Sequence, residues 1–189
     1  MDVVSTFATA MLDARAMQPP AVTDDAAFEA VYRAHAPGVY RFCLSQLRDP
    51  HLAEDVAAAC FTSAYAGWRR ARFDSPQAVR PWIYRIARNA VCDEWRRQGR
   101  RRESPASEMV RGGIDVATAA GIRAELRAVM AAIDGLPERD RLIVGLRLGG
   151  GLSHAEVGAV LGMSERASIT ATARALERLR ARLDAEGWR

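Results

Sequence analysis

The residues best suited to chemistry in this chain are the arginines, tryptophans and asparagine between positions 80 and 102. This segment reads RPWIYRIARNAVCDEWRRQGRRR. Residues 69–102 hold eleven Arg against three acidic residues, whereas the whole chain carries a formal net charge of only +4. Guanidinium groups and aromatic faces together suit a polyanion whose bases can unstack. The segment therefore predicts contact with nucleic acid of single-stranded character.

The remaining composition points to a protein without a metal or cofactor. All basic residues are Arg, and the sequence pI of about 9.4 favours an anionic partner. Three cysteines and three histidines are scattered without a CxxC pair or zinc-ligand spacing: Cys43, Cys60, Cys92, His35, His51 and His154. We expect reduced, buried thiols, as in a cytoplasm.

Two further classes of protein are excluded at this level. No Ser, Cys or carboxylate pair is placed for nucleophilic or acid–base work, so the chain is not expected to be an enzyme. The N-terminus lacks a basic region followed by an unbroken apolar stretch, and no apolar run is long enough to span a membrane. Neither a secretory signal nor a membrane span is predicted.

The elements that must position the arginine-rich segment are helices. Residues 1–22 read as a tail or a short docking helix, and residues 23–102 as a first domain of four helices. Pro37-Gly38 predicts a break between the first two helices, and residues 74–76 predict a loop before the fourth. Apolar residues of the fourth helix recur at Ile83, Ile86, Ala87, Ala90 and Val91, which leaves the arginines on its other side.

Residues 103–120 show no period and predict a linker, so the fold class is all-α with two small helical domains. The second domain spans 121–189. Ser153 and Glu156 form a capping box at the start of a short helix, and Gly162 precedes a longer helix from about residue 165 to 185. This pattern is typical of a helix-turn-helix.

Three segments in this order resemble the bacterial sigma-70 family, in particular the small two-domain group called extracytoplasmic-function (ECF) sigma factors. They are FEAVYRAHAP at 28–37, WIYRIARNAVCD at 82–93, and LPERDR at 136–141 followed by GLSHAE at 151–156. The resemblance covers roughly residues 25–102 and 122–183. It implies a protein that binds RNA polymerase core and directs it to promoters.

The resemblance implies that the first domain is a sigma-2 module, which binds the polymerase clamp helices and melts the −10 element. The residues expected at −10 DNA are Arg72, Phe73, Asp74, Ser75, Trp82, Arg85, Arg88, Asn89, Arg96 and Arg97. Residues 72–76 occupy the place of the loop that receives a flipped base, and Trp82 either stacks on an unpaired base or fills the core. The residues expected at the polymerase are Leu52, Asp55, Phe61, Tyr65 and Trp68.

The second domain resembles sigma-4, which reads the −35 element and docks on the polymerase flap. The groove-facing residues expected on its recognition helix are Arg166, Ser168, Thr170, Thr172 and Arg174. An apolar stripe of Ile169, Ala173, Leu176 and Leu183 is expected to face inward. Family members are usually controlled by an anti-sigma protein, so one is an expected partner.

The chain departs from the family at two places. The clamp-binding helix usually carries Gln and an acidic residue where Ala58 and Ala59 stand, and an ungapped alignment puts Ile169 and Ala171 where basic residues are usual. These departures keep open a second class of function, a sigma-like interaction protein that has lost normal polymerase or promoter contacts. A dimeric helix-turn-helix regulator is a third reading, which the aromatic, basic helix of the first domain disfavours.

Overall fold

The computed structural model describes residues 24–103, 129–185 and 187, and all regular structure in these ranges is helical. The predicted all-α fold class is therefore confirmed. The tail predicted at 1–22 and nearly all of the predicted linker lie outside the described residues. The elements fall into an N-terminal unit of α2 to α4 and a C-terminal unit of residues 129–185, which contains α6 to α8.

The first element is one continuous helix where the sequence predicted two. α2 (Asp24–Leu47) runs through Pro37 without a break, so the prediction of a break at Pro37-Gly38 is wrong. Gly38 has a different role, because a Cβ added there would meet the Tyr84 hydroxyl of α4. Pro37 has no backbone N–H, so α2 lacks one backbone hydrogen bond at this position. The burial of one face of α2 against neighbouring helices outweighs this local cost.

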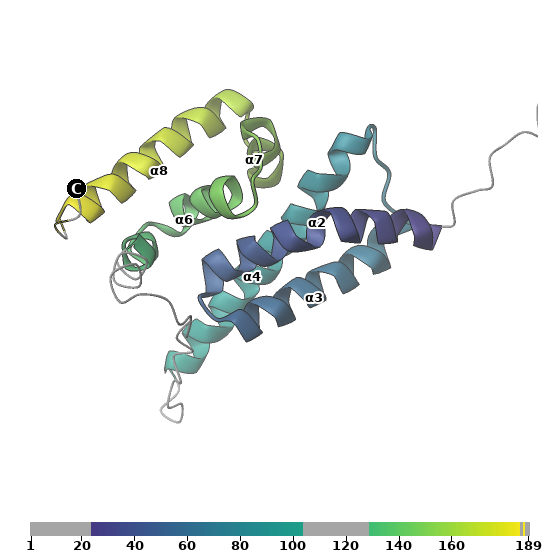
Figure 1. Ribbon diagram of the computed structural model, residues 1–189, viewed down its shortest axis with the longest axis horizontal. Helices are drawn as coiled ribbons and strands as arrows, with labels where there is room; N and C mark the ends of the chain where they lie inside the picture. The colour runs from purple at the N-terminus through teal and green to yellow at the C-terminus, as the bar shows by residue number, and fades with distance from the viewer. Residues whose placement is uncertain (1–23, 104–128, 186, 188–189) are drawn as a thin grey trace, which may run out of the picture.

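α3 (Pro50–Trp68) follows α2 after a sharp turn. Arg48 adopts a positive φ of 63°, and the Asp49 side chain then accepts a hydrogen bond of 3.1 Å from the Leu52 amide. Pro50 stands at the first helical position, where its missing N–H breaks no bond. α3 lies alongside α2, and Figure 1 shows the two helices running side by side.

The arginine-rich segment forms the long helix α4 (Val79–Glu103), preceded by a short 3-10 turn η1 (Pro76–Ala78). Its inner face is apolar as predicted: Ile83, Ala87 and Val91 are completely buried against α2 and α3. Tyr84 is also buried and meets Phe42 edge-on, with ring centroids 6.0 Å apart. Packing on this side leaves most of the arginines on the outer side of α4.

In the C-terminal unit, residues 129–134 are helical and lead to α6 (Glu138–Val144) and the π-helical turn η2 (Gly145–Gly149). α7 (His154–Leu161) begins with the predicted capping box. Ser153 Oγ accepts from the Glu156 amide at 3.2 Å, and the Glu156 carboxylate accepts from the Ser153 amide at 2.7 Å. Gly162, with φ 69°, ends α7 before α8 (Glu165–Ala185), so the helix-turn-helix is confirmed.

The two units share one hydrophobic core. Buried side chains of the C-terminal unit belong to the same cluster as the core of α2, α3 and α4; they are Leu142, Leu146, Leu152, Val157 and Val160. A smaller cluster holds α8 against α6 and residues 132–136. In Figure 1, α6 to α8 accordingly lie together across α2 from α3, with α8 outermost. A shared core means that the units form one body in this structure.

Candidate nucleic-acid interface

The outer side of α4 carries an arginine–asparagine pair suited to hold a nucleic acid. Arg88 donates two hydrogen bonds, of 3.2 and 2.7 Å, to the amide oxygen of its neighbour Asn89. This pairing fixes the Asn89 side chain with its NH₂ group free to donate, since the acceptor oxygen is occupied. A guanidinium and an oriented amide can respectively hold a phosphate and read a base edge.

Further along α4, two arginines are braced by acidic neighbours on the same helix. Arg96 pairs with Asp93 at 2.7 Å and Arg97 pairs with Glu94 at 2.6 Å. Glu94 is buried, whereas both guanidinium groups remain exposed. The arginines are thus oriented by their partners and still open to a phosphate backbone.

The loop before α4 closes an aromatic cluster. The Phe73 ring lies 5.5 Å from Trp68 and 5.3 Å from Trp82, measured between centroids, and the two tryptophans are 6.2 Å apart. Of the two readings left open for Trp82, this packing fits the core-filling one, although the ring is still half-buried. Arg72 and Asp74 of the loop are exposed, the Arg72 guanidinium donating to the Arg69 and Ala71 carbonyls at 3.2 and 3.1 Å, and Ser75 is half-buried.

The residues predicted to meet polymerase divide between surface and core. Asp55 is exposed, Tyr65 is 50% exposed with its hydroxyl donating to Asp25 at 2.9 Å, and Leu52 and Trp68 are half-buried. Phe61 is only 6% exposed and packs edge-on against Tyr32, 4.8 Å between centroids. The prediction that Phe61 is available to polymerase is therefore wrong, because α2 covers it. Ala58 and Ala59 are both exposed.

The recognition helix α8 is rotated relative to the prediction. Ser168 and Thr172, predicted to face DNA, are 0% and 7% exposed, and they face inward with Ala175 and Leu179. Ile169 and Leu176, predicted to face inward, are 49% and 41% exposed. Both assignments are wrong for one reason: α8 packs against α6 and α7 through the side that carries the buried residues Ser168, Thr172, Ala175 and Leu179. Leu183 does pack against the smaller core, as predicted.

The outward residues on the first turns of α8 form the surface that a DNA groove would meet. They are Arg166, Ala167, Ile169, Thr170, Ala173 and Arg174, all exposed. Arg166, Thr170 and Arg174 were predicted, whereas Ile169 and Ala173 were not. Helix propensity and helical periodicity alone could not identify Ile169 and Ala173 as outward-facing. The sequence of α8 contains two possible buried stripes, one residue apart, and periodicity does not choose between them.

Two arginines of α4 are already engaged by the C-terminal unit. Arg85, predicted to bind −10 DNA, donates at 2.8 Å to the Ala159 carbonyl of α7. Arg80 donates to the Gly150 and Gly151 carbonyls at 2.9 Å each and pairs with Glu156 at 3.2 Å. The buried Tyr84 hydroxyl also donates to the Gly150 carbonyl, at 3.0 Å. Sequence reasoning missed Arg80 and Tyr84, whose partners lie about 70 residues away.

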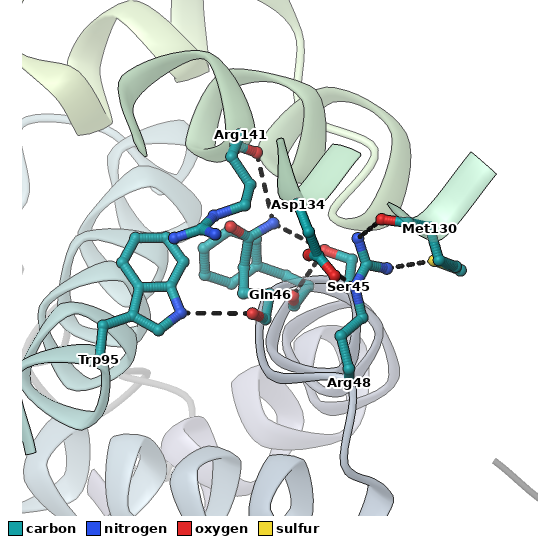
Figure 2. A network of polar contacts seen from close by, with 8 residues as sticks. Ser45, Gln46, Arg48, Trp95, Met130, Asp134 and Arg141 are labelled. Atoms are coloured by element: carbon teal, nitrogen blue, oxygen red, sulfur yellow. Dashed lines mark hydrogen bonds and ion pairs between the residues drawn. The ribbon is translucent and has the colours of Figure 1, made fainter. Parts of the chain in front are cut away.

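A second set of contacts joins the units at the other end of the interface. The Arg141 guanidinium lies over the Trp95 ring, 3.9 Å from its centroid, while the Trp95 indole N–H donates to the Gln46 carbonyl at 3.3 Å. Arg48 pairs with Asp134 at 3.2 Å. Figure 2 shows Gln46 of α2, Trp95 of α4, Arg141 of α6 and the Arg48–Asp134 pair gathered in one small region.

The cysteines are placed as inert core groups. Cys43 and Cys60 are fully buried, and burial raises the pKa of each thiol to about 12, so both stay protonated at neutral pH. Cys92 is half-buried near Glu138. Among the described residues, no group of His, Cys, Asp and Glu is arranged to hold a metal ion, and no helix is long and apolar enough to cross a membrane.

Two family models match the two units. Residues 31–101 match sigma-70 region 2, and residues 126–179 match sigma-70 region 4. The chain is 32% identical over 160 residues to the RNA polymerase sigma factor CarQ of Myxococcus xanthus, covering 82% of this chain and 87% of CarQ. It is 28% identical to the ECF sigma factor SigM of Bacillus subtilis, covering 81% and 93%. A match of 36% identity to the ECF sigma factor SigF of Caulobacter vibrioides covers 61% of this chain and 63% of that protein.

Solved structures resemble the whole arrangement. CnrH in complex with the cytosolic domain of CnrY matches with a TM-score of 0.63 at 25% identity, covering 84% of this chain and 88% of CnrH. The sigma factor RpoE of Bartonella quintana, in complex with the anti-sigma factor NepR, matches with a TM-score of 0.66 at 21% identity, covering 83% and 96%. Each match is longer than either unit, so the shared fold includes both.

Proposed function

Because this chain belongs to the ECF group of the sigma-70 family of RNA polymerase sigma factors, we propose that its N-terminal unit opens the −10 element and its C-terminal unit contacts the −35 element. The partners of such a factor are RNA polymerase core and promoter DNA. Sigma factors are non-enzymatic initiation factors, and RNA synthesis belongs to the polymerase. The alternative of an interaction protein without promoter function is not favoured.

The observation that carries the −10 assignment is the pairing of Arg88 with Asn89 on the outer side of α4. Arg88 holds a phosphate of the non-template strand, and the free NH₂ of Asn89 donates to a base. Arg96 and Arg97 contact the duplex backbone upstream, where their acidic partners keep them extended. Arg85 joins them once it leaves Ala159.

The loop at 72–75 is proposed to receive a base flipped from the non-template strand. Phe73 anchors the loop on Trp68 and Trp82, so its backbone is held while Arg72 and Asp74 remain exposed. An anchored loop with outward polar side chains can bind an unstacked base at a low entropic cost. Trp82 supports this site from below as part of the aromatic cluster.

Polymerase binding is proposed for the exposed side of α3. Asp55 and Tyr65 lie on this surface, with Leu52 and Trp68 contributing their partly exposed edges. Ala58 and Ala59 contribute only methyl groups to this surface. Contact there depends on burial of small side chains, since these two positions offer no polar side-chain group.

The −35 contact is proposed for the outward surface of α8, with Arg166 and Arg174 on phosphates and Thr170 and Ile169 toward base edges. Apolar side chains read thymine in the major groove through its methyl group. An anti-sigma protein is a further proposed partner, supported by the matched RpoE structure, which is a complex with one.

The test of the −10 assignment is the double variant Arg88→Ala/Asn89→Ala, compared with the wild type on promoter DNA with polymerase core. Permanganate reactivity of unpaired thymines reports opening, and a pull-down of core reports polymerase binding. We expect opening to be lost while core binding stays within about twofold. Opening that survives in the double variant would show that the single-stranded DNA face lies elsewhere.

A further inference from the structure

We infer that the ion pair between Asp140 of α6 and Arg178 of α8 selects which face of the recognition helix is turned toward DNA. Asp140 and Arg178 are positioning residues, because they act by fixing the rotation of α8 about its own axis and so act through the side chains that α8 presents. The inference rests on the proposed assignment of α8 to the −35 element.

Two stripes on α8, offset by one residue, compete for the buried position. The stripe that is buried in the structure, called the inner stripe, consists of Ser168, Thr172, Ala175 and Leu179. The stripe that is left exposed, called the outer stripe, consists of Ile169, Ala173 and Leu176. Successive residues of an α-helix are about 100° apart, so a rotation of α8 by that angle exchanges the two stripes.

Burial of apolar side chains does not by itself favour the inner stripe. This stripe buries one large apolar side chain, Leu179, whereas the outer stripe leaves two of them, Ile169 and Leu176, exposed. The Ser168 hydroxyl is buried without a hydrogen-bond partner in the described part of the chain, which costs free energy. The Thr172 hydroxyl donates back to the Ser168 carbonyl of the same helix. The observed rotation therefore needs a further source of stability.

The C-terminal end of α8 does not choose between the stripes through its apolar side chains. Leu183 follows Leu179 by four residues and Leu176 by seven, so it continues either stripe. Arg180 is in line with the outer stripe, and its aliphatic stem lets the charge reach water when this side packs inward. The choice must be made by groups beside the stripes.

Asp140 and Arg178 can meet in one rotation only. Asp140 is buried in the first turn of α6 and accepts from the Arg178 guanidinium. Arg178 stands beside Leu179 at the edge of the inner stripe, and turning the outer stripe inward would carry it to the position that the exposed Glu177 holds now. Asp140 would then be a buried charge without its partner, which is strongly unfavourable. The pair thus stabilises one rotation and disfavours the other.

Arg182 extends this arrangement by one turn of α8. Its guanidinium lies against Gly135, where an added Cβ would collide with it. Arg178 and Arg182 are four residues apart and share one face of the helix. Both therefore meet the short segment 135–140, which contains the start of α6. This edge of α8 is matched to α6 by polar groups, while the inner stripe beside it is poor in large apolar side chains.

The rotation decides which side chains a DNA groove meets. In the observed rotation Ile169 is exposed, and an apolar side chain reads the methyl group of thymine. In the other rotation Ile169 turns inward, and the hydroxyl of Ser168 turns outward as a hydrogen-bonding group. Arg178 exerts this control from nine residues further along, roughly 14 Å along the helix axis. The ion pair is therefore a determinant of −35 specificity.

The release variant is Asp140→Asn/Arg178→Met, which removes both charges, keeps the size of both side chains and leaves no unpaired charge buried. Asp140→Asn alone is a milder form of the same change. Arg178→Lys is the conservative variant, because it keeps a cation for Asp140. The matched control, Arg139→Met/Glu177→Gln, removes one arginine and one carboxylate from exposed positions on α6 and α8. Circular dichroism checks that each chain keeps its helix content.

Thiol labelling reports the rotation of α8 in the full-length chain without DNA. One thiol is placed at a time in a Cys92→Ser background, by Ser168→Cys on the inner stripe or by Ala173→Cys on the outer stripe. Cys43 and Cys60 are fully buried and stay unlabelled while the chain is folded. With the ion pair intact, we expect the outer thiol to react with an aromatic disulfide reagent at least about tenfold faster than the inner thiol, since a buried thiol reacts only after local opening.

In the release variant the order of the two labelling rates should reverse, with the inner thiol faster and the outer thiol slower. Asp140→Asn alone should shift both rates in the same directions by a smaller factor, whereas Arg178→Lys and the matched control should keep the wild-type order. Adding Leu176→Gln to the release variant should restore that order, because the outer stripe then loses a large apolar side chain. Rates that both rise, as from loosened packing, or rates that both stay unchanged would overturn the inference.

DNA binding tests the link to specificity separately. The polymerase complex is titrated by fluorescence anisotropy with promoter DNA in which each −35 thymine is replaced in turn by uracil. The wild type should lose about fourfold in affinity at the thymine that Ile169 meets, and the release variant should lose nothing there although Ile169 is still present. Reversed labelling with an unchanged uracil penalty would overturn the inference. A wild type whose affinity depends on no −35 base would instead contradict the proposed function, whatever the labelling shows.

Discussion

Ser168 and Ile169 are neighbours on α8 with opposite environments: Ser168 is completely buried and Ile169 is half exposed. The Ser168 hydroxyl has no hydrogen-bond partner among the described residues, and its carbonyl accepts from the Thr172 hydroxyl at 2.8 Å. Ser168 lies on the side of α8 that packs against α6 and α7. The consequence is that the second turn of the recognition helix presents the branched apolar side chain of Ile169 beside Thr170, while the Ser168 hydroxyl is buried.

The exposed Ile169 side chain predicts recognition of a thymine methyl group in the −35 element. Replacing the contacted thymine with uracil removes one methyl group and should weaken binding of the polymerase complex about fourfold, the value of one buried carbon. Scanning the −35 thymines one at a time with uracil, by fluorescence anisotropy, identifies the contact.

Ile169→Ser is the matching protein variant, since the side chain is exposed and its loss should leave the fold unchanged. The uracil penalty at the contacted position should disappear in this variant, while other positions keep theirs. Identical uracil scans for the wild type and Ile169→Ser would show that Ile169 does not meet a base.

Gly158 is predicted to be essential to the helix-turn-helix for a steric reason. A Cβ at this position would lie 2.6 Å from the Met163 carbonyl oxygen and 3.3 Å from the Ser164 carbonyl carbon, both main-chain atoms. Gly158→Ala should lower the free energy of unfolding by about 1–3 kcal/mol, measured by urea denaturation. Gly99→Ala is the control, because open space surrounds Gly99 within α4 and the change should add about 0.5–1 kcal/mol. Equal stability of the two variants would contradict this packing.

We expect that polar substitutions at Ala58 and Ala59 strengthen the contact with polymerase core. Both are exposed on α3, and family members usually carry Gln and an acidic residue there. Ala58→Gln/Ala59→Glu should raise the affinity for polymerase core by roughly tenfold if each new hydrogen bond contributes about 0.5–1.5 kcal/mol. Titration of labelled protein with core measures this. Ala66→Gln, also exposed on α3, is the control. No gain over that control would place the polymerase contact away from these residues.

His35 predicts that acid destabilises the fold. Burial lowers the pKa of His35 below its ordinary value, the nearby Arg80 lowers it further, and Glu156 opposes this in part. His35 therefore binds fewer protons in the folded chain than in the unfolded chain. Its contribution to the free energy of unfolding is complete above pH 6.5 and falls as the pH drops below that value, by at most about 1.4 kcal/mol per pH unit. The free energy of unfolding, measured by urea denaturation, should fall between pH 7.5 and 5.5.

His35→Asn is the control for this pH dependence, because Asn keeps a polar side chain that does not titrate. The free energy of unfolding of this variant should change much less over the same interval. A wild-type response equal to that of His35→Asn would assign the pH dependence to other groups.

The sequence predicted the elements whose signals are local. The Ser153–Glu156 capping box and the Gly162 turn are each encoded within a few residues, and the structure contains both. The apolar stripe of α4 also appears as predicted, because one face of a long helix repeats often enough to be unambiguous.

The sequence could not predict features that depend on distant packing. Pro37-Gly38 is a local signal for a break. In the structure, however, Gly38 is needed because a Cβ there would collide with the Tyr84 hydroxyl of another helix. On α8, alternating small and apolar residues offer two buried stripes, and packing against α6 and α7 decides between them. The contacts of Arg80 and Arg85 with the C-terminal unit connect positions that no sequence period relates.

The most direct test of the central claim is transcription by polymerase core from the same organism, with and without the purified protein, on sheared genomic DNA. Sequencing the 5′ ends of the transcripts locates every start. We expect a small set of starts that share upstream −10 and −35 sequences and that vanish with Arg88→Ala/Asn89→Ala. Starts no different from those of core alone would contradict the conclusion that this chain directs polymerase to promoters.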